Sequence, residues 1–124
     1  MNKNALGLLL FRIGLGGVFV LFGIDKFFHP AFWAGYIPPW FTLLSSGTLL
    51  VVLGIVEAIL GAMVLVGFGT RFAASISALM LLGIIISLGY SEIMVRDAGL
   101  LCLALGIAVL GAGEYSFDHR LRKV

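Results

Sequence analysis

An arginine inside the first apolar run constrains this chain more than any other feature. Residues 5–28 are apolar enough to lie in lipid, yet Arg12 interrupts them and the charged pair Asp25-Lys26 lies near their end. On insertion scales, an arginine at membrane depth costs roughly 2.5 to 3.5 kcal/mol, so it is kept where it faces protein, water or an anionic partner. This segment therefore requires neighbouring helices. At helical spacing, the residues that share a face with Arg12 are Gly16, Phe19, Gly23 and Lys26.

The composition indicates that the chain has enough apolar sequence to form those neighbouring helices. The chain has 124 residues, of which 61% are hydrophobic and 11% are charged, and its mean hydropathy is +1.17. A membrane span needs about 20 apolar residues, so the chain can form four spans with short connections and one membrane domain over residues 1–124. We expect an all-α bundle of four transmembrane helices in a lipid bilayer. The predicted spans are residues 5–28, 47–67, 72–89 and 96–111, with residues 92–95 left open as an extension of the fourth.

The amino terminus superficially resembles a signal peptide, because a lysine precedes an apolar run. Arg12 interrupts that run, however, and no cleavage site of the small-x-small type follows it. We therefore expect the segment to be retained as the first span.

Neither thiol chemistry nor metal chemistry is indicated by the sequence. Cys102 is the only cysteine, which excludes an internal disulfide and a Cys-rich metal framework, and its apolar flanks predict a packed core thiol. His29 and His119 are expected on opposite sides of the membrane, so we predict no metal or haem site. The positive charges are dispersed, which gives no reason to expect nucleic acid as a partner.

The connection after the first span, HPAFWAGYIPPWF, is rich in aromatic residues and proline. Trp and Tyr favour the membrane interface, so the segment is ordinarily an interface anchor. The alternative is a lid that lies over a hydrophobic pocket and admits the tail of a quinone from the bilayer. Its candidate ligand-binding residues are His29, Trp33 and Tyr36, and its other notable residues are Pro30, Pro38, Pro39, Trp40 and Phe41.

The distribution of Lys and Arg predicts the orientation. Four spans place both termini on one side of the membrane, and that side would carry six basic residues against two on the other. The positive-inside rule then places both termini in the cytoplasm, at the inner membrane of a bacterium. The six are Lys3, Arg12, Arg71, Arg120, Arg122 and Lys123, and the two are Lys26 and Arg96.

Arg12 and Glu57 are the charged residues expected deepest in the bundle. From the cytoplasmic side they would lie about 10 and 15 Å deep at 1.5 Å of helical rise per residue, which permits an ion pair between the first two spans. Gly54 and Gly61 share the face of Glu57. The sequence leaves open whether this pair only fixes the helix register or binds the head group of a ligand, such as a quinone carbonyl or a small anion.

A second charged group is predicted at the outer rim. Lys26 and Arg96 could form a cationic pocket for an anionic substrate, with Asp25 and Asp97 as counter-charges. Alternatively, they could form a salt-bridged clasp between the first and fourth spans. Asp97 is also expected to favour the start of the fourth helix. His29 is either an ordinary interfacial residue or a group that handles protons.

Taken in order, these motifs resemble the DoxX family of small four-helix membrane proteins, which includes the DoxD subunit of thiosulfate:quinone oxidoreductase and the MauE-like proteins. The ending GAGEYSFD resembles the family's Gly-Pro-Gly-x-aromatic-Ser-x-Asp pattern, with Ala112 in place of the proline. The chain is shorter than DoxD proteins. The other residues that carry the resemblance are Arg12, Gly23, Lys26, Pro30, Glu57, Gly61, Gly67, Arg71, Arg96 and Asp97.

The resemblance implies a role in membrane redox chemistry or in sulfur and thiol metabolism. We expect a quinone-interacting or accessory subunit of a membrane redox system, part of a quinone-linked oxidoreductase, with a bound quinone and no redox centre of its own. No catalytic residue is assigned. The alternatives are a non-catalytic scaffold or assembly factor that binds a protein partner, and a transporter of small solutes. Glycine-rich faces would suit a homo-oligomer as well as an intramolecular bundle.

Overall fold

The structure, a computed structural model, describes residues 2–35, 37 and 45–122. Within these residues the chain is helical and contains no strand. Four of the helices are long and apolar enough to cross a membrane, so the protein is a four-helix membrane protein, as the sequence predicts. The helices are α1 (Lys3–Phe28), α2 (Pro30–Ala34), α3 (Ser46–Val66), α4 (Thr70–Leu88), α5 (Glu92–Leu110) and α6 (Phe117–Arg122).

The four long helices agree with the predicted spans to within four residues at each end. The largest difference is at the start of the fourth span, where residues 92–95 belong to α5. The hydroxyl of Ser91 accepts a hydrogen bond from the backbone N–H of Met94 at 3.1 Å and so caps this helix. Glu92 therefore occupies the first turn, and the prediction that Asp97 opens the helix is wrong. Asp97 lies in the second turn and is buried.

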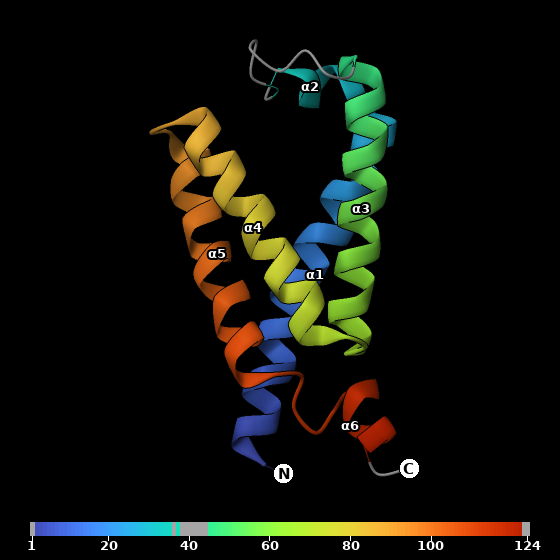
Figure 1. Ribbon diagram of the computed structural model, residues 1–124. Coiled ribbons are helices and arrows are strands. Elements are labelled where there is room, and N and C mark those ends of the chain that lie inside the picture. Colours follow the sequence, from blue (N-terminus) through green and yellow to red (C-terminus); the bar gives the residue numbers. More distant parts are fainter. Residues whose placement is uncertain (1, 36, 38–44, 123–124) are drawn as a thin grey trace.

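The bundle consists of two helix pairs. α1 packs along α3, and α4 packs along α5. The pairs approach each other near the end that carries both termini and diverge toward the end that carries α2 (Figure 1). The helix axes of the two pairs are thus closer together at one end of the bundle than at the other (Figure 1).

The α1–α3 contact depends on glycine. A Cβ atom on Gly16 would lie 2.8 Å from the carbonyl oxygen of Gly61, and one on Gly23 would lie 2.7 Å from the carbonyl oxygen of Gly54. No real Cβ atom tolerates such distances from backbone, so the two helices are in backbone contact at both places. Small residues permit this close approach between membrane helices, as the sequence indicates for α1.

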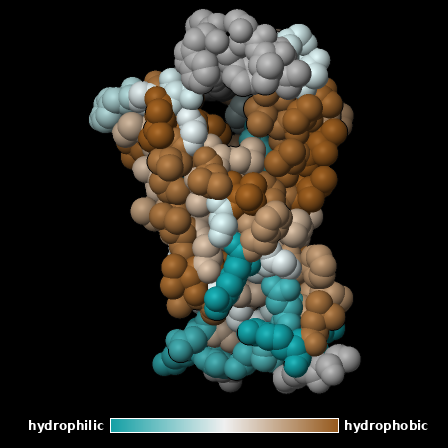
Figure 2. Space-filling view, in the orientation of Figure 1, coloured by the Kyte–Doolittle hydropathy of each residue, from teal (hydrophilic) through white to brown (hydrophobic). Residues whose placement is uncertain are grey.

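The core lies between the two pairs, and the outer surface is largely apolar (Figure 2). Cys102 lies on that surface and is exposed, so the prediction of a packed core thiol is wrong. In a membrane protein the lipid-facing side of a helix is as apolar as the core-facing side, and apolar flanks do not distinguish them. The buried core residues are Leu15, Phe19, Leu60, Val64, Ala73, Ala74, Ala78, Leu81, Ala104 and Ile107.

Candidate functional site: a pocket between the helix pairs

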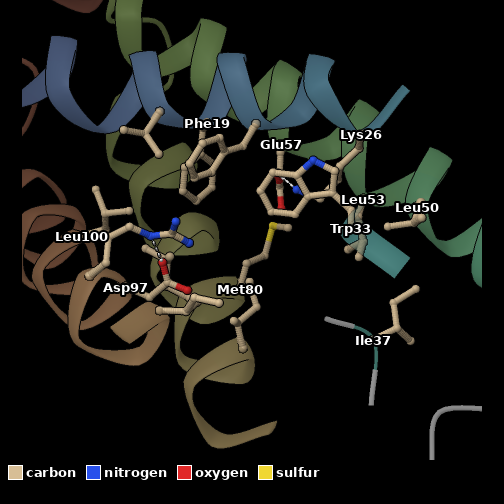
Figure 3. A pocket seen from close by; sticks show the side chains of 16 residues that line it. Phe19, Lys26, Trp33, Ile37, Leu50, Leu53, Glu57, Met80, Asp97 and Leu100 are labelled. Carbon is tan, nitrogen blue, oxygen red and sulfur yellow. Dashed lines mark hydrogen bonds and ion pairs between the residues drawn. The ribbon is translucent and has the colours of Figure 1, made fainter. Parts of the chain in front are cut away.

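A pocket of about 100 Å³ lies between the two helix pairs, toward the α2 end, and all four long helices line it (Figure 3). Most of its wall is apolar. Among the described residues, charged side chains enter it from two places, the α1–α3 pair and α5. The lining residues are Val18, Phe19, Phe22, Lys26, Trp33, Ile37, Leu50, Leu53, Glu57, Met80, Leu81, Ile84, Ile93, Arg96, Asp97 and Leu100.

Lys26 of α1 and Glu57 of α3 form the first charged group. The Lys26 Nζ lies 2.7 Å from Oε2 of Glu57, and both residues are more than nine-tenths buried. The ring of Trp33 lies against the same ammonium, with its centroid 4.0 Å from Nζ. A desolvated ammonium is stabilised by an adjacent carboxylate and by the negative face of an indole ring, so the three side chains support one another.

Asp25 holds Trp33 in place. The indole Nε1 donates a hydrogen bond to Oδ2 of Asp25 at 2.8 Å, and Nδ1 of His29 lies 2.6 Å from Oδ1 of the same carboxylate. α2 begins directly after His29 with Pro30, whose fixed φ suits the first position of a helix. One carboxylate at the end of α1 thus fixes the position of α2, and Trp33 becomes part of the pocket wall.

Arg96 and Asp97 of α5 form the second charged group. The Arg96 Nε donates to Oδ1 of Asp97 at 3.2 Å, and its guanidinium lies 5.0 Å from the ring centroid of Phe22 on α1. Asp97 is buried, whereas the Arg96 side chain is 45% exposed. The pocket therefore contains two cations and two carboxylates, and their formal charges cancel.

Two charge pairings that the sequence allowed are not formed. Arg12 and Glu57 do not pair, because Glu57 is bound by Lys26, and Arg12 lies near the opposite end of the bundle among backbone carbonyls. The salt-bridged clasp between the first and fourth spans is also wrong, because Arg96 pairs with its own neighbour Asp97. Lys26 and Arg96 do line one pocket, but it is not the cationic pocket of the alternative interpretation, because Glu57 and Asp97 line it as well.

Arg12 joins α3 to the segment after α5. It is 1% exposed and donates four hydrogen bonds, to the carbonyl oxygens of Val64 (2.9 Å), Leu65 (2.7 Å), Ala112 (3.2 Å) and Tyr115 (2.7 Å). Carbonyls at the end of a helix have no partner within the helix, and a guanidinium with five donors can satisfy several at once. This geometry gives Arg12 a structural role away from the pocket.

Asp118 is an important residue that the sequence analysis missed, although it lies in the GAGEYSFD motif. Its carboxylate accepts hydrogen bonds from the backbone N–H groups of Gly69 and Thr70, each at 2.9 Å, and so caps α4 from a distance in sequence. Partial desolvation acts to raise the pKa of Asp118, but the bonds from Thr70 and Gly69 outweigh it and hold the pKa below its ordinary value. Gly69 itself offers no side chain to cap the helix.

The remaining predicted residues lie at the rim or outside the described part of the chain. The His29 side chain is 67% exposed and contacts Asp25 rather than the pocket. Tyr36 lies outside the described residues, as do Pro38, Pro39, Trp40 and Phe41 of the predicted lid. Across the described residues, no three His, Cys, Asp or Glu side chains form a group that could hold a metal ion.

Comparison with known proteins gives one result. The family model described as DoxX matches residues 7–90, which cover most of α1, all of α2, α3 and α4, and the start of the turn before α5. The matched range includes Arg12, both partners of the Lys26–Glu57 pair, and Trp33. Neither a curated protein nor a solved structure matches the chain.

Proposed function

This chain belongs to the DoxX family of membrane proteins, and we propose that it acts as a quinone-interacting subunit of a membrane redox system. The pocket between the helix pairs would receive the quinone ring. In this proposal the chain positions the quinone, and a partner protein supplies or removes the electrons, because the redox chemistry belongs to the bound cofactor and its electron donor.

One observation carries the proposal: two charge pairs stand in the wall of an otherwise apolar pocket that all four long, apolar helices line. Charged residues inside a membrane bundle are expensive and commonly mark a functional site. Ligand pockets typically combine apolar walls with a few polar groups that orient the ligand. The aromatic and aliphatic wall suits a quinone ring, and the N–H groups of Lys26 and Arg96 could donate to its carbonyls.

The orientation completes the proposal. With both termini in the cytoplasm, the pocket would lie in the outer half of the membrane, below α2. A partner on the outer face would then approach over α2, where Phe28 and Phe32 expose large apolar surfaces, 75% and 60% respectively. Exposed apolar side chains at this end are also what a scaffold protein would present, so we retain a protein-binding scaffold as the second candidate function.

The test is direct binding of quinone to the purified protein. Decylubiquinone, added to the protein in detergent, should raise its thermal unfolding temperature in a saturable way, because a ligand that binds only the folded state stabilises it. The double variant Lys26→Met with Glu57→Gln removes both charges together, so no unpaired ion is left to unfold the bundle. It should fold but lose the quinone-dependent shift.

The matched control is Glu114→Gln, which changes an exposed carboxylate at the far end of the molecule and should keep the full shift. If decylubiquinone stabilised the wild type in neither its oxidised nor its reduced form, the quinone proposal would be wrong. A protein partner recovered from membranes in mild detergent, and lost after Phe32→Ser, would then support the scaffold.

A further inference from the structure

In the described part of the chain, each carboxylate of the pocket accepts a hydrogen bond on one of its two oxygens. Oε2 of Glu57 accepts from Lys26, and Oδ1 of Asp97 accepts from Arg96. The second oxygens, Oε1 of Glu57 and Oδ2 of Asp97, accept no hydrogen bond from any residue that the structure describes, and neither is sealed away from the cavity. Both residues are nearly buried, at 6% and 4% exposure. Each of these two oxygens therefore keeps a free accepting position on a residue that lines the cavity.

The two cations of the pocket, Lys26 and Arg96, have more contacts than the two free carboxylate oxygens. The Lys26 ammonium has Glu57 on one side and the face of Trp33 on another. The Arg96 guanidinium contacts the ring of Phe22, and the side chain is exposed enough to reach water or lipid head groups. Both cations keep unused N–H groups, but each already has a carboxylate partner, whereas the two free carboxylate oxygens need a ligand that donates.

The charge balance of the pocket also restricts the class of ligand that can bind. Two cations and two carboxylates already neutralise one another in the pocket, so an ionic ligand would add an uncompensated charge to a site of low dielectric. A neutral ligand would not. The two free oxygens belong to different walls, one on α3 and one on α5, and Glu57 and Asp97 stand on separate sides of Met80 (Figure 3). The wall between them is apolar and suits a ring.

From this arrangement we infer that the pocket selects a neutral aromatic diol, whose two hydroxyl groups donate to Oε1 of Glu57 and Oδ2 of Asp97. This inference rests on the proposed function and deepens it: the ligand bound most tightly is the quinol, the reduced form, rather than the quinone. A quinone has two carbonyl acceptors and no donor, so it cannot satisfy either carboxylate oxygen. Asp97 and Glu57 would then both orient the ligand, each by accepting a hydrogen bond from one hydroxyl group.

The experiment compares three compounds that share one ring and one tail. Decylubiquinol, decylubiquinone and the dimethyl ether of decylubiquinol are titrated anaerobically against the full-length protein in detergent, with affinity measured by calorimetry and by thermal shift. The quinol should bind about tenfold or more tightly than the other two, since a hydrogen bond to a charged group has about this effect and the ether has lost both donors.

A pair of variants on α5 tests the second acceptor. Asp97→Asn should reduce the preference for quinol over its dimethyl ether by about tenfold, because a charge-assisted hydrogen bond becomes a neutral one. The variant should fold, since the Arg96 it leaves unpaired is partly exposed. Glu92→Gln changes an exposed carboxylate on the same helix that does not line the pocket, and it should keep the preference of the wild type.

The outcomes separate this inference from the proposed function. Binding of quinone as tight as that of quinol would overturn the inference and leave the quinone site intact. Failure of all three compounds to bind would overturn both. Hydroquinone without a tail identifies the source of the diol: affinity equal to that of decylubiquinol supports a water-borne diol, and much weaker affinity supports a membrane quinol.

Discussion

The ammonium of Lys26 lies 2.7 Å from Oε2 of Glu57, and neither side chain is more than 8% exposed. The pair joins α1 to α3 near a place where the helices touch backbone to backbone, at Gly23 and Gly54. A buried ion pair is strongly destabilising when one partner is removed, whereas the loss of both partners is often nearly neutral.

The first prediction is therefore a double-mutant cycle. Lys26→Met alone and Glu57→Leu alone should each lower the free energy of unfolding by about 3 kcal/mol or more, because each leaves one buried charge without its partner. The double variant should recover most of that loss. Unfolding in mixed detergent micelles measures all four proteins, and losses that simply add would contradict the prediction.

A second prediction concerns Arg12. Arg12→Met removes the donor of four hydrogen bonds and leaves carbonyls at the end of α3 and after α5 without partners. We expect a loss of about 3 kcal/mol or more in unfolding free energy, with Arg12→Lys restoring only part of it because lysine lacks the planar fork. Arg120→Met, at an exposed position, serves as the control and should change stability by less than about 0.5 kcal/mol.

The glycine contacts give a third prediction, with a neighbouring residue as its control. Gly16→Ala would force a methyl group to 2.8 Å from the carbonyl oxygen of Gly61, and it should destabilise the protein by about 1 to 3 kcal/mol. A Cβ at Gly17 would meet nothing within 4 Å, so Gly17→Ala should be neutral or slightly stabilising. Equal effects of the two substitutions would show that α1 and α3 are not in backbone contact.

Asp118 gives a prediction for the dependence of stability on pH. Its pKa is lowered in the folded protein, so its carboxylate contributes stability above the ordinary value of about 3.9 and loses that contribution as the pH falls through the folded pKa. Wild type should therefore exceed Asp118→Asn in stability near neutral pH, and the gap should close in acid. Melting curves recorded between neutral pH and about pH 3 provide the measurement. A stability difference between the two proteins that widened in acid would contradict the prediction.

The fifth prediction is the orientation in the membrane. In a Cys102→Ser background, Lys3→Cys should react with a membrane-impermeant thiol reagent only after the membrane is permeabilised. Tyr90→Cys, at a position 89% exposed between α4 and α5, should react in intact cells. The reverse pattern would overturn the orientation predicted from six basic residues against two.

The sequence predicted the fold better than the pairing of its charges. Apolar length locates a span, because hydrocarbon thickness fixes how many residues it needs, and this argument places the ends of all four helices within four residues. The cost of burying a charge in lipid also predicts that Arg12 and Glu57 each have a polar or charged partner. It does not identify the compensating groups, since the acceptors of Arg12 are backbone carbonyls, which every residue possesses.

In the pocket, too, the sequence predicted which residues take part but not how they pair. Lys26, Glu57, Arg96, Asp97 and Trp33 were all named as ligand-binding candidates from the sequence, and the structure brings all five into the wall of one cavity. Their ligand remains a proposal. The pairing of Lys26 with Glu57 depends on the relative rotation and height of α1 and α3, which glycine contacts decide and which a single sequence does not report. Asp118 was missed for a related reason, because it caps a helix 48 residues away.

The hydrogen bonds of Arg12 and Asp118 have a mechanical consequence. They tie the α3–α4 turn to the carboxyl-terminal segment at the end where the core is filled, so the two helix pairs share a fixed pivot there. A small sideways movement about such a pivot grows with distance along the helices. Any such movement would therefore change the width of the cavity beneath α2 more than the packing at the end that carries both termini.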